Sequence, residues 1–240
     1  MRVIFIDFLV HGWIVYHECV QANQHTDPAR AFHLGRPAKR HPPAAFSHFA
    51  PYTVKTIFLP LAVISTLLLG TTFVLGWTIQ DAAEPSLSHQ VDHHLWTALA
   101  GMLFATLVHG LVMTYFIGTG RWFEETTRAY STTGESVIGE CYAASRALKY
   151  RTVMTIVAGF TLLLAAGTLG AAADPASPVG FTGWLGLAPA TLHLLVALAA
   201  VAVNSWTHLA EYSALHENAK LIERMMDQVR QIRAERGLVD

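Results

Sequence analysis

Two histidines stand inside long uncharged stretches of this sequence, His109 and His193. An ionisable side chain at membrane depth is a functional candidate, because hydrocarbon offers it no water and no charge partner. Two histidines on facing helices can ligate a haem iron through their ring nitrogens. Counted from the outer ends of their stretches, they differ in depth by roughly 7 Å, a gap that helix tilt can close. Two interpretations stay open: a haem b held by His109 and His193, or neutral histidines hydrogen-bonded within a helical bundle.

A second set of candidate ligands lies in an acidic connection, where His89, Asp92 and His93 occur close together. If this connection is helical, His89 and His93 lie one turn apart on the same face, a spacing that suits a metal ion. The alternative is that these residues cap a helix or lie in a solvated loop. The sequence shows no phosphate-binding loop, nucleophile motif or zinc-protease motif. Beyond the haem alternative, no cofactor is therefore expected.

The elements that must position these residues are membrane-spanning helices. The chain has 240 residues, of which 52% are hydrophobic and only 14% are charged, whereas soluble domains have about 25% charged residues. Four uncharged runs are each long enough to cross a bilayer as a helix of about 20 residues. The predicted spans are 57–80, 95–120, 152–173 and 186–207. The predicted fold class is an all-α integral membrane protein, with residues 53–209 as a four-span bundle.

The basic residues predict the orientation of these spans. All 16 Lys and Arg residues fall before the first run, between the second and third, or after the fourth. The other two connections contain no basic residue, so every Lys and Arg lies on one side of a four-span bundle. Because cytoplasmic loops carry the excess of Lys and Arg, both termini are predicted to be cytoplasmic. We expect a multi-pass protein of the inner (cytoplasmic) membrane.

Three further segments lie outside the spans. Residues 1–20 form an apolar helix for which two placements stay open, one in the membrane interface and one as a fifth span. Residues 21–52 are basic and rich in proline and histidine. They are predicted to be a linker, because proline at this density opposes helix and sheet. Residues 121–151 are predicted to form a cytoplasmic helical hairpin between the second and third spans.

The longest predicted helix runs from Pro189 to Arg236, with proline at its start and Gly237 after its end. Its second half, 210–240, is charged and amphipathic. Apolar residues repeat there every seven positions, with one asparagine among them, which is the pattern of a short coiled-coil seam. The expected partner-contact residues of this seam are Leu215, Asn218, Ile222, Met225, Val229 and Ile232. Their partner is either the 121–151 hairpin, another subunit or a second copy of the chain.

These features favour a non-enzymatic accessory or scaffold subunit of a larger inner-membrane complex, because the seam and the basic segments suit protein contacts while no catalytic motif occurs. Its expected partners are the lipid bilayer and other membrane subunits, and no nucleic acid. One alternative is a b-type haem electron-transfer subunit that uses His109 and His193. Another is a protein that self-associates through its C-terminal helix.

Overall fold

The computed structural model describes residues 51–79, 82–130 and 137–237. Within these ranges the secondary structure is helical, apart from an isolated bridge between Trp184 and Leu187. The elements are α2 (Pro51–Thr78), the short 3-10 helix η3 (Pro85–Leu87), α3 (Ser88–Tyr130), α4 (Val137–Ala173) and α5 (Pro189–Glu235). The predicted helix 1–20 and the predicted linker, up to residue 50, lie outside the described residues.

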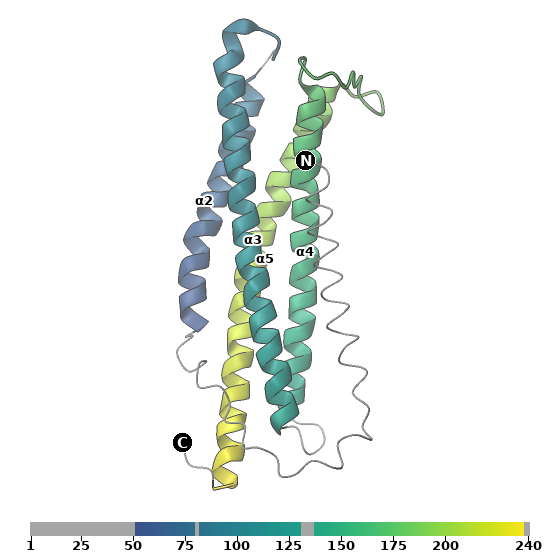
Figure 1. Ribbon diagram of the computed structural model, residues 1–240. Helices are drawn as coiled ribbons and strands as arrows, with labels where there is room; N and C mark the ends of the chain where they lie inside the picture. Colours follow the sequence, from purple (N-terminus) through teal and green to yellow (C-terminus); the bar gives the residue numbers. More distant parts are fainter. Residues whose placement is uncertain (1–50, 80–81, 131–136, 238–240) are drawn as a thin grey trace, which may run out of the picture. The chain divides into compact units, whose positions relative to one another are not determined.

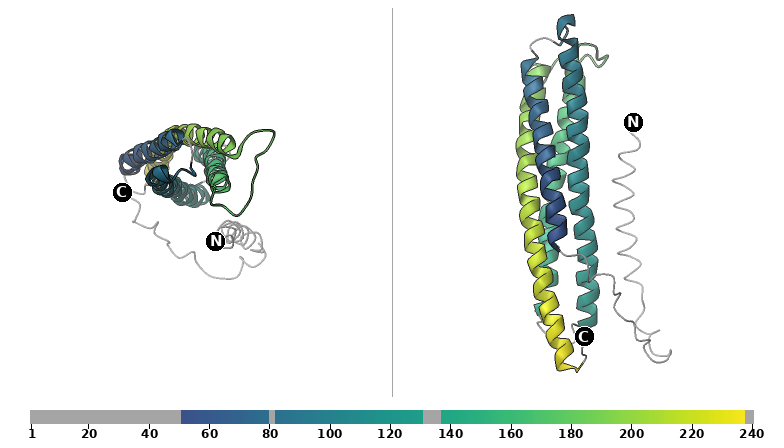
Figure 2. Two further views of the ribbon diagram at one scale, coloured as in Figure 1. Left: turned by 90° about the horizontal axis from the view of Figure 1, so that it is seen from above. Right: turned by 90° about the vertical axis from the view of Figure 1, so that its left-hand side faces the viewer.

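The four long helices form an up-and-down bundle (Figure 1). Helix α2 packs beside α3, and α4 packs extensively along α5, while the diagonal helices α3 and α5 have few direct contacts. Seen along the bundle, the four helices surround a common centre (Figure 2). We call the end with residues 82–87 and 174–188 the loop end. At the opposite end, the extended end, α3, α4 and α5 project beyond the start of α2.

All four helices are long and apolar enough to cross a membrane. Large apolar side chains cover their outward faces, for example Leu67, Leu103 and Trp206, whose side chains are mostly exposed. A soluble monomer rarely exposes apolar surface on this scale, whereas lipid covers it without cost. The prediction of an all-helical bundle with four spans is confirmed, and the chain is compatible with a multi-pass membrane protein.

Threonine hydroxyls on the outward faces hydrogen-bond within their own helices. Thr106 donates to the carbonyl oxygen of Met102, and Thr114 donates to that of Gly110. Both donor–acceptor distances are 2.8 Å. Thr161 on α4 donates in the same way, four residues back along its helix. Such backward bonds satisfy a hydroxyl that would otherwise face hydrocarbon without a partner. These positions are therefore polar in composition but offer lipid no free donor.

The predicted long helix is present as α5, which has 47 residues and is therefore about 70 Å long. It starts at Pro189 after the extended residue Ala188, and ends at Glu235. Gly237 follows with φ +66°, a left-handed conformation that glycine adopts without strain. Pro189 and Gly237 therefore predict both ends of α5 to within one residue.

The predicted seam of α5 packs inside the chain. Met225 and Val229 are buried against Phe123 of α3 and against Ile138 and Cys141 of α4. Ile222 and Ile232 are partly buried at the edge of this cluster, and Leu215 is buried in the neighbouring one. The residues of the seam therefore contact the hairpin of α3 and α4, which is one of the three partners that the sequence left open.

Asn218, the polar position of the seam, is fully hydrogen-bonded in a buried layer. Its side-chain oxygen accepts from the Ser145 hydroxyl at 2.7 Å. Its amide nitrogen donates to the Tyr115 hydroxyl and to Thr119 Oγ1, each at 3.2 Å. Because each of these groups would cost free energy if buried without a partner, the layer favours one alignment of α5 against its neighbours.

Candidate metal centre

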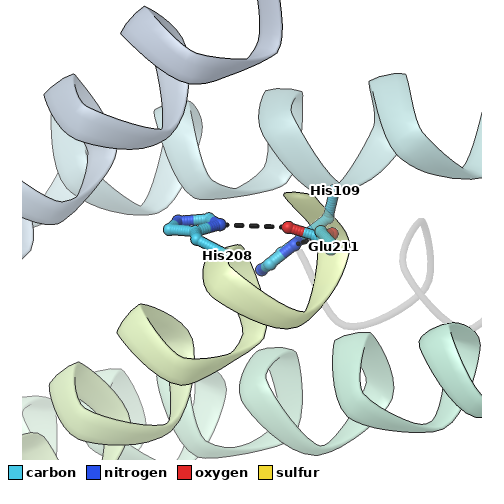
Figure 3. Close-up of side chains that lie close together, drawn as sticks. All are labelled: His109, His208 and Glu211. Atoms are coloured by element: carbon cyan, nitrogen blue, oxygen red, sulfur yellow. Dashed lines mark hydrogen bonds and ion pairs between the residues drawn. The ribbon is translucent and has the colours of Figure 1, made fainter. Parts of the chain in front are cut away.

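Three buried side chains converge between the diagonal helices. His109 comes from α3, and His208 and Glu211 come from α5, where a spacing of three residues places both on one helix face. Figure 3 shows the three side chains pointing toward one another. Their relative exposures are 3%, 4% and 0%. A carboxylate so completely removed from water needs strong compensating partners.

Glu211 provides one carboxylate oxygen to each histidine. Its Oε1 lies 2.8 Å from Nδ1 of His109, and its Oε2 lies 3.1 Å from Nδ1 of His208. The centroids of the two imidazole rings are 5.1 Å apart. One ligand atom from each of the three residues can be chosen so that all lie within 4.8 Å of one another. We call these three residues the triad.

Asn204 determines which nitrogen of His109 carries a proton. The amide nitrogen of Asn204 lies 2.8 Å from the carbonyl oxygen of Ala200 and 3.1 Å from that of Gly159. Because carbonyl oxygens only accept, this amide nitrogen must be the donor, and Oδ1 of Asn204 is then the atom 3.1 Å from Nε2 of His109. An amide oxygen also only accepts, so Nε2 of His109 carries a proton.

A proton on Nε2 of His109 determines what can lie between Nδ1 of the same ring and Glu211. In neutral imidazole with Nε2 protonated, Nδ1 bears a lone pair. That lone pair faces the Glu211 carboxylate at 2.8 Å, and two acceptors cannot hydrogen-bond to each other. A proton or a metal ion is needed between them. It is either a proton, carried by Nδ1 as a buried ion pair or by the Glu211 carboxyl as a neutral hydrogen bond, or a metal ion bound by both groups.

His208 fits the metal-bound arrangement. Its Nε2 lies 3.2 Å from the hydroxyl oxygen of Ser65 on α2, and a hydroxyl group can either donate or accept. With a metal ion on both Nδ1 atoms, both Nε2–H groups donate outward, from His109 to Asn204 and from His208 to Ser65. Histidines that bind metal ions usually hold their second ring nitrogen in this way.

The donor set also indicates which metal ions the triad suits. Two imidazole nitrogens and one carboxylate are typical ligands of Zn²⁺, Fe²⁺ and related first-row ions. Mg²⁺ and Ca²⁺ prefer oxygen ligands throughout. Three protein ligands leave at least one coordination position for a further ligand.

The structure places the sequence-predicted residues at different levels of the bundle. His193 lies opposite His94, with ring centroids 6.1 Å apart, and the ring that faces His109 belongs to His208. His89, Asp92 and His93 lie in the first turns of α3 and are exposed at the loop end. Among the described residues, only the triad satisfies the geometric requirement for three converging ligands.

Sequence reasoning missed His208 and Glu211. The sequence did contain a signal for them, a histidine and a glutamate three residues apart at the end of the last uncharged run. Glu211 was grouped with the charged half of α5, yet it is the first charge of that half and is completely buried. Glutamate and histidine three residues apart on one helix commonly direct metal ligands into the core of a helical bundle.

Comparison of the chain with protein-family models, with curated proteins and with solved structures finds no match.

Proposed function

We propose that this chain is a non-enzymatic membrane protein that binds one divalent transition-metal ion through His109, His208 and Glu211. The observation that carries this proposal is the 2.8 Å contact between Nδ1 of His109 and a carboxylate oxygen of Glu211, together with the Asn204 oxygen on the other side of the ring, which indicates that Nε2 already carries a proton. The outer hydrogen bonds of both rings are those that metal-bound histidines make. A divalent cation would neutralise the carboxylate and occupy both lone pairs at once.

The ion is proposed to hold α3 and α5 together, because these diagonal helices have few direct contacts of their own. One shallow pocket in the described part of the chain is lined by residues 182–188, and another lies between α4 and α5 beside Leu148 and Leu221. Neither includes a residue of the triad. Because neither pocket reaches the triad, the open coordination position of the ion would not meet a substrate, which supports a non-enzymatic subunit.

Metal analysis of the protein tests this proposal. The full chain, purified in detergent without chelators and freed of loosely bound ions, is expected to contain about one non-haem transition-metal ion per molecule. His109→Ala, His208→Ala and Glu211→Gln each remove a ligand, so each is expected to lower that content at least tenfold. His216→Ala is the matched control, since His216 is an exposed histidine of the same helix.

A different result would contradict the proposal. If folded wild-type protein stays free of metal after exposure to Zn²⁺, Fe²⁺ and Mn²⁺, a proton lies between Nδ1 and the carboxyl group. The triad is then a buried hydrogen-bonded pair of His109 and Glu211 with no metal ion. Equal metal content in wild type and in all three ligand variants would place the ion elsewhere and would also overturn the assignment.

We further propose that the extended end faces the cytoplasm of an inner-membrane protein and contacts other subunits. All 16 Lys and Arg residues fall in the three segments that lead to this end, as expected for cytoplasmic segments. Since the α5 seam is occupied by the chain's own hairpin, contacts with another subunit or a second copy would use the charged outer face of α5.

Labelling of single cysteines tests this orientation. In a chain with Cys19 and Cys141 replaced by alanine, Glu84→Cys at the loop end is expected to react with a membrane-impermeant maleimide in intact cells. Lys220→Cys is expected to react only after the membrane is opened, because the extended end faces inward. The reverse pattern would overturn the orientation together with the proposed cytoplasmic contacts.

A further inference from the structure

A second pair of histidines faces across the bundle near the loop end. His94 of α3 and His193 of α5 have ring centroids 6.1 Å apart and ring planes at 83°. His94 precedes His109 by 15 residues, and His193 precedes His208 by the same number. This interval corresponds to about 22 Å along an α-helix. The two diagonal helices therefore carry histidines at two matching levels.

The His94 ring is held by helix α2. Its Nδ1 lies 3.0 Å from the carbonyl oxygen of Thr72. One turn further along α2, a Cβ atom on Gly76 would lie only 2.8 Å from Cε1 of His94. The ring therefore occupies space that any other residue at position 76 would fill, so the close approach requires glycine.

The His193 ring is held by helix α4 in the same way. Its Nδ1 lies 3.0 Å from the carbonyl oxygen of Ala166. A Cβ atom on Gly170, again four residues further along, would lie 2.9 Å from Cε1 of His193. The same arrangement of a carbonyl acceptor and a glycine is thus built twice, once in α2 and α3 and once in α4 and α5.

These hydrogen bonds leave the same nitrogen available in both rings. A backbone carbonyl only accepts, so Nδ1 of His94 and Nδ1 of His193 each carry the proton. In a neutral ring, Nε2 then has a lone pair that can bind a metal ion. Within the described residues, no hydrogen bond involves either Nε2 atom. Both rings have the fixed orientation that ligating histidines obtain from a backbone acceptor.

The number and charge of these ligands distinguish between metals. A protein-bound Zn²⁺ ion usually has three or four protein ligands, and this pair of histidines supplies two. Haem iron receives four nitrogens from the porphyrin and needs only two axial ligands. With metal–nitrogen bonds of about 2.0–2.1 Å, two axial imidazoles on one iron have ring centroids roughly 6 Å apart. The observed 6.1 Å matches this separation, whereas the 5.1 Å separation in the triad is shorter.

We propose that His94 and His193 are the two axial ligands of a haem iron near the loop end of the bundle. Each histidine lies in the second turn of its helix and is partly buried, so the haem carboxylates can reach water, which their charge requires. Gly76 and Gly170 position the rings. The assignment uses no residue of the triad and stands independently of the metal ion proposed there.

Absorbance spectroscopy of the full chain, produced in cells supplied with a haem precursor and purified in detergent, tests this proposal. We expect one haem per chain, with the bands of a six-coordinate low-spin haem in the reduced state. His94→Ala and His193→Ala are each expected to lose at least nine-tenths of the haem. His93→Ala, an exposed neighbour on α3, is the control. Added imidazole is expected to restore binding to His193→Gly, which separates loss of a ligand from misfolding.

Two further variants test the positions of the rings. Gly170→Leu keeps both ligands but drives a side chain into the space of His193, so haem content is expected to fall as in His193→Ala. His94→Met keeps a ligand of another type and is expected to change the spectrum and raise the reduction potential.

Wild-type protein that stays colourless with added haem would overturn the proposal. So would haem that is kept by His94→Ala and His193→Ala but lost from His109→Ala. Non-haem metal is measured on the same samples, so the haem proposal and the proposal for the triad can be contradicted separately.

Discussion

Replacing Glu211 with alanine is expected to lower the free energy of unfolding in detergent by about 3–5 kcal/mol, the usual cost of breaking a buried charge pair. Glu211 is completely buried, and each of its oxygens contacts one histidine. Without the carboxylate, a buried cation at His109 loses its counter-charge, and two ring nitrogens lose their partner. Equilibrium unfolding, followed by circular dichroism, measures the difference.

An exposed glutamate of the same helix is the control for this prediction. Glu217 lies 3.9 Å from Arg151, and both side chains are more than half exposed. Glu217→Ala is therefore expected to change stability by less than about 1 kcal/mol. In a double-mutant cycle, Glu211→Ala and His109→Ala are expected to be strongly non-additive because they remove the same interaction. A loss below about 1 kcal/mol for Glu211→Ala would contradict the account of the triad as a compensated buried charge.

Replacing Asn204 with leucine is expected to weaken binding of the metal ion by 10–100-fold, the usual effect of removing an outer hydrogen-bond partner of a ligand. Asn204 has no exposed surface and connects α5 to α3 and α4 through His109 and Gly159. Leucine has a similar volume but cannot accept a hydrogen bond from Nε2–H of His109. The ring then loses the hydrogen bond that directs Nδ1 toward Glu211. Competition with a chelator of known affinity measures the change.

Ser205→Ala is the matched control, because Ser205 is the next residue on α5 and its hydroxyl donates only to the carbonyl oxygen of Val201. Its effect on ion affinity is expected to be less than twofold, since its hydroxyl bonds to the backbone and not to a ligand of the ion. If Asn204→Leu binds the ion as tightly as Ser205→Ala does, the proton on Nε2 of His109 is not fixed by Asn204. The argument for a cation at Nδ1 would then fail.

The helices could be predicted from the sequence because their determinants are local. Uncharged runs identify the spans, and Pro189 and Gly237 identify the ends of α5. The distribution of Lys and Arg separates the two ends of the bundle without any knowledge of packing. The seam of α5 was also visible as a seven-residue repeat, although its partner, the hairpin of α3 and α4, is a tertiary contact that a repeat alone does not specify.

The pairing of the histidines could not be predicted in this way, because it depends on the relative heights of two helices that are distant in sequence. The uncharged run that contains His109 begins at residue 95, whereas α3 itself starts at Ser88, so the run alone gives the wrong depth for His109. With that start, His94 and His193 lie at similar distances from the beginnings of their helices. The burial of Glu211 could not be predicted either, because a buried carboxylate is recognised only when its partners are known.

The backward hydrogen bonds of Thr106, Thr114 and Thr161 affect how this protein is recognised within the plane of the membrane. With their hydroxyl protons already engaged, these threonines present methyl groups and oxygens that can only accept hydrogen bonds to a neighbouring helix. A neighbouring helix finds no hydroxyl donor at these sites, so its contacts there depend mainly on how closely the two surfaces pack. Chemical discrimination between neighbours is left to the charged segments that emerge from the bilayer.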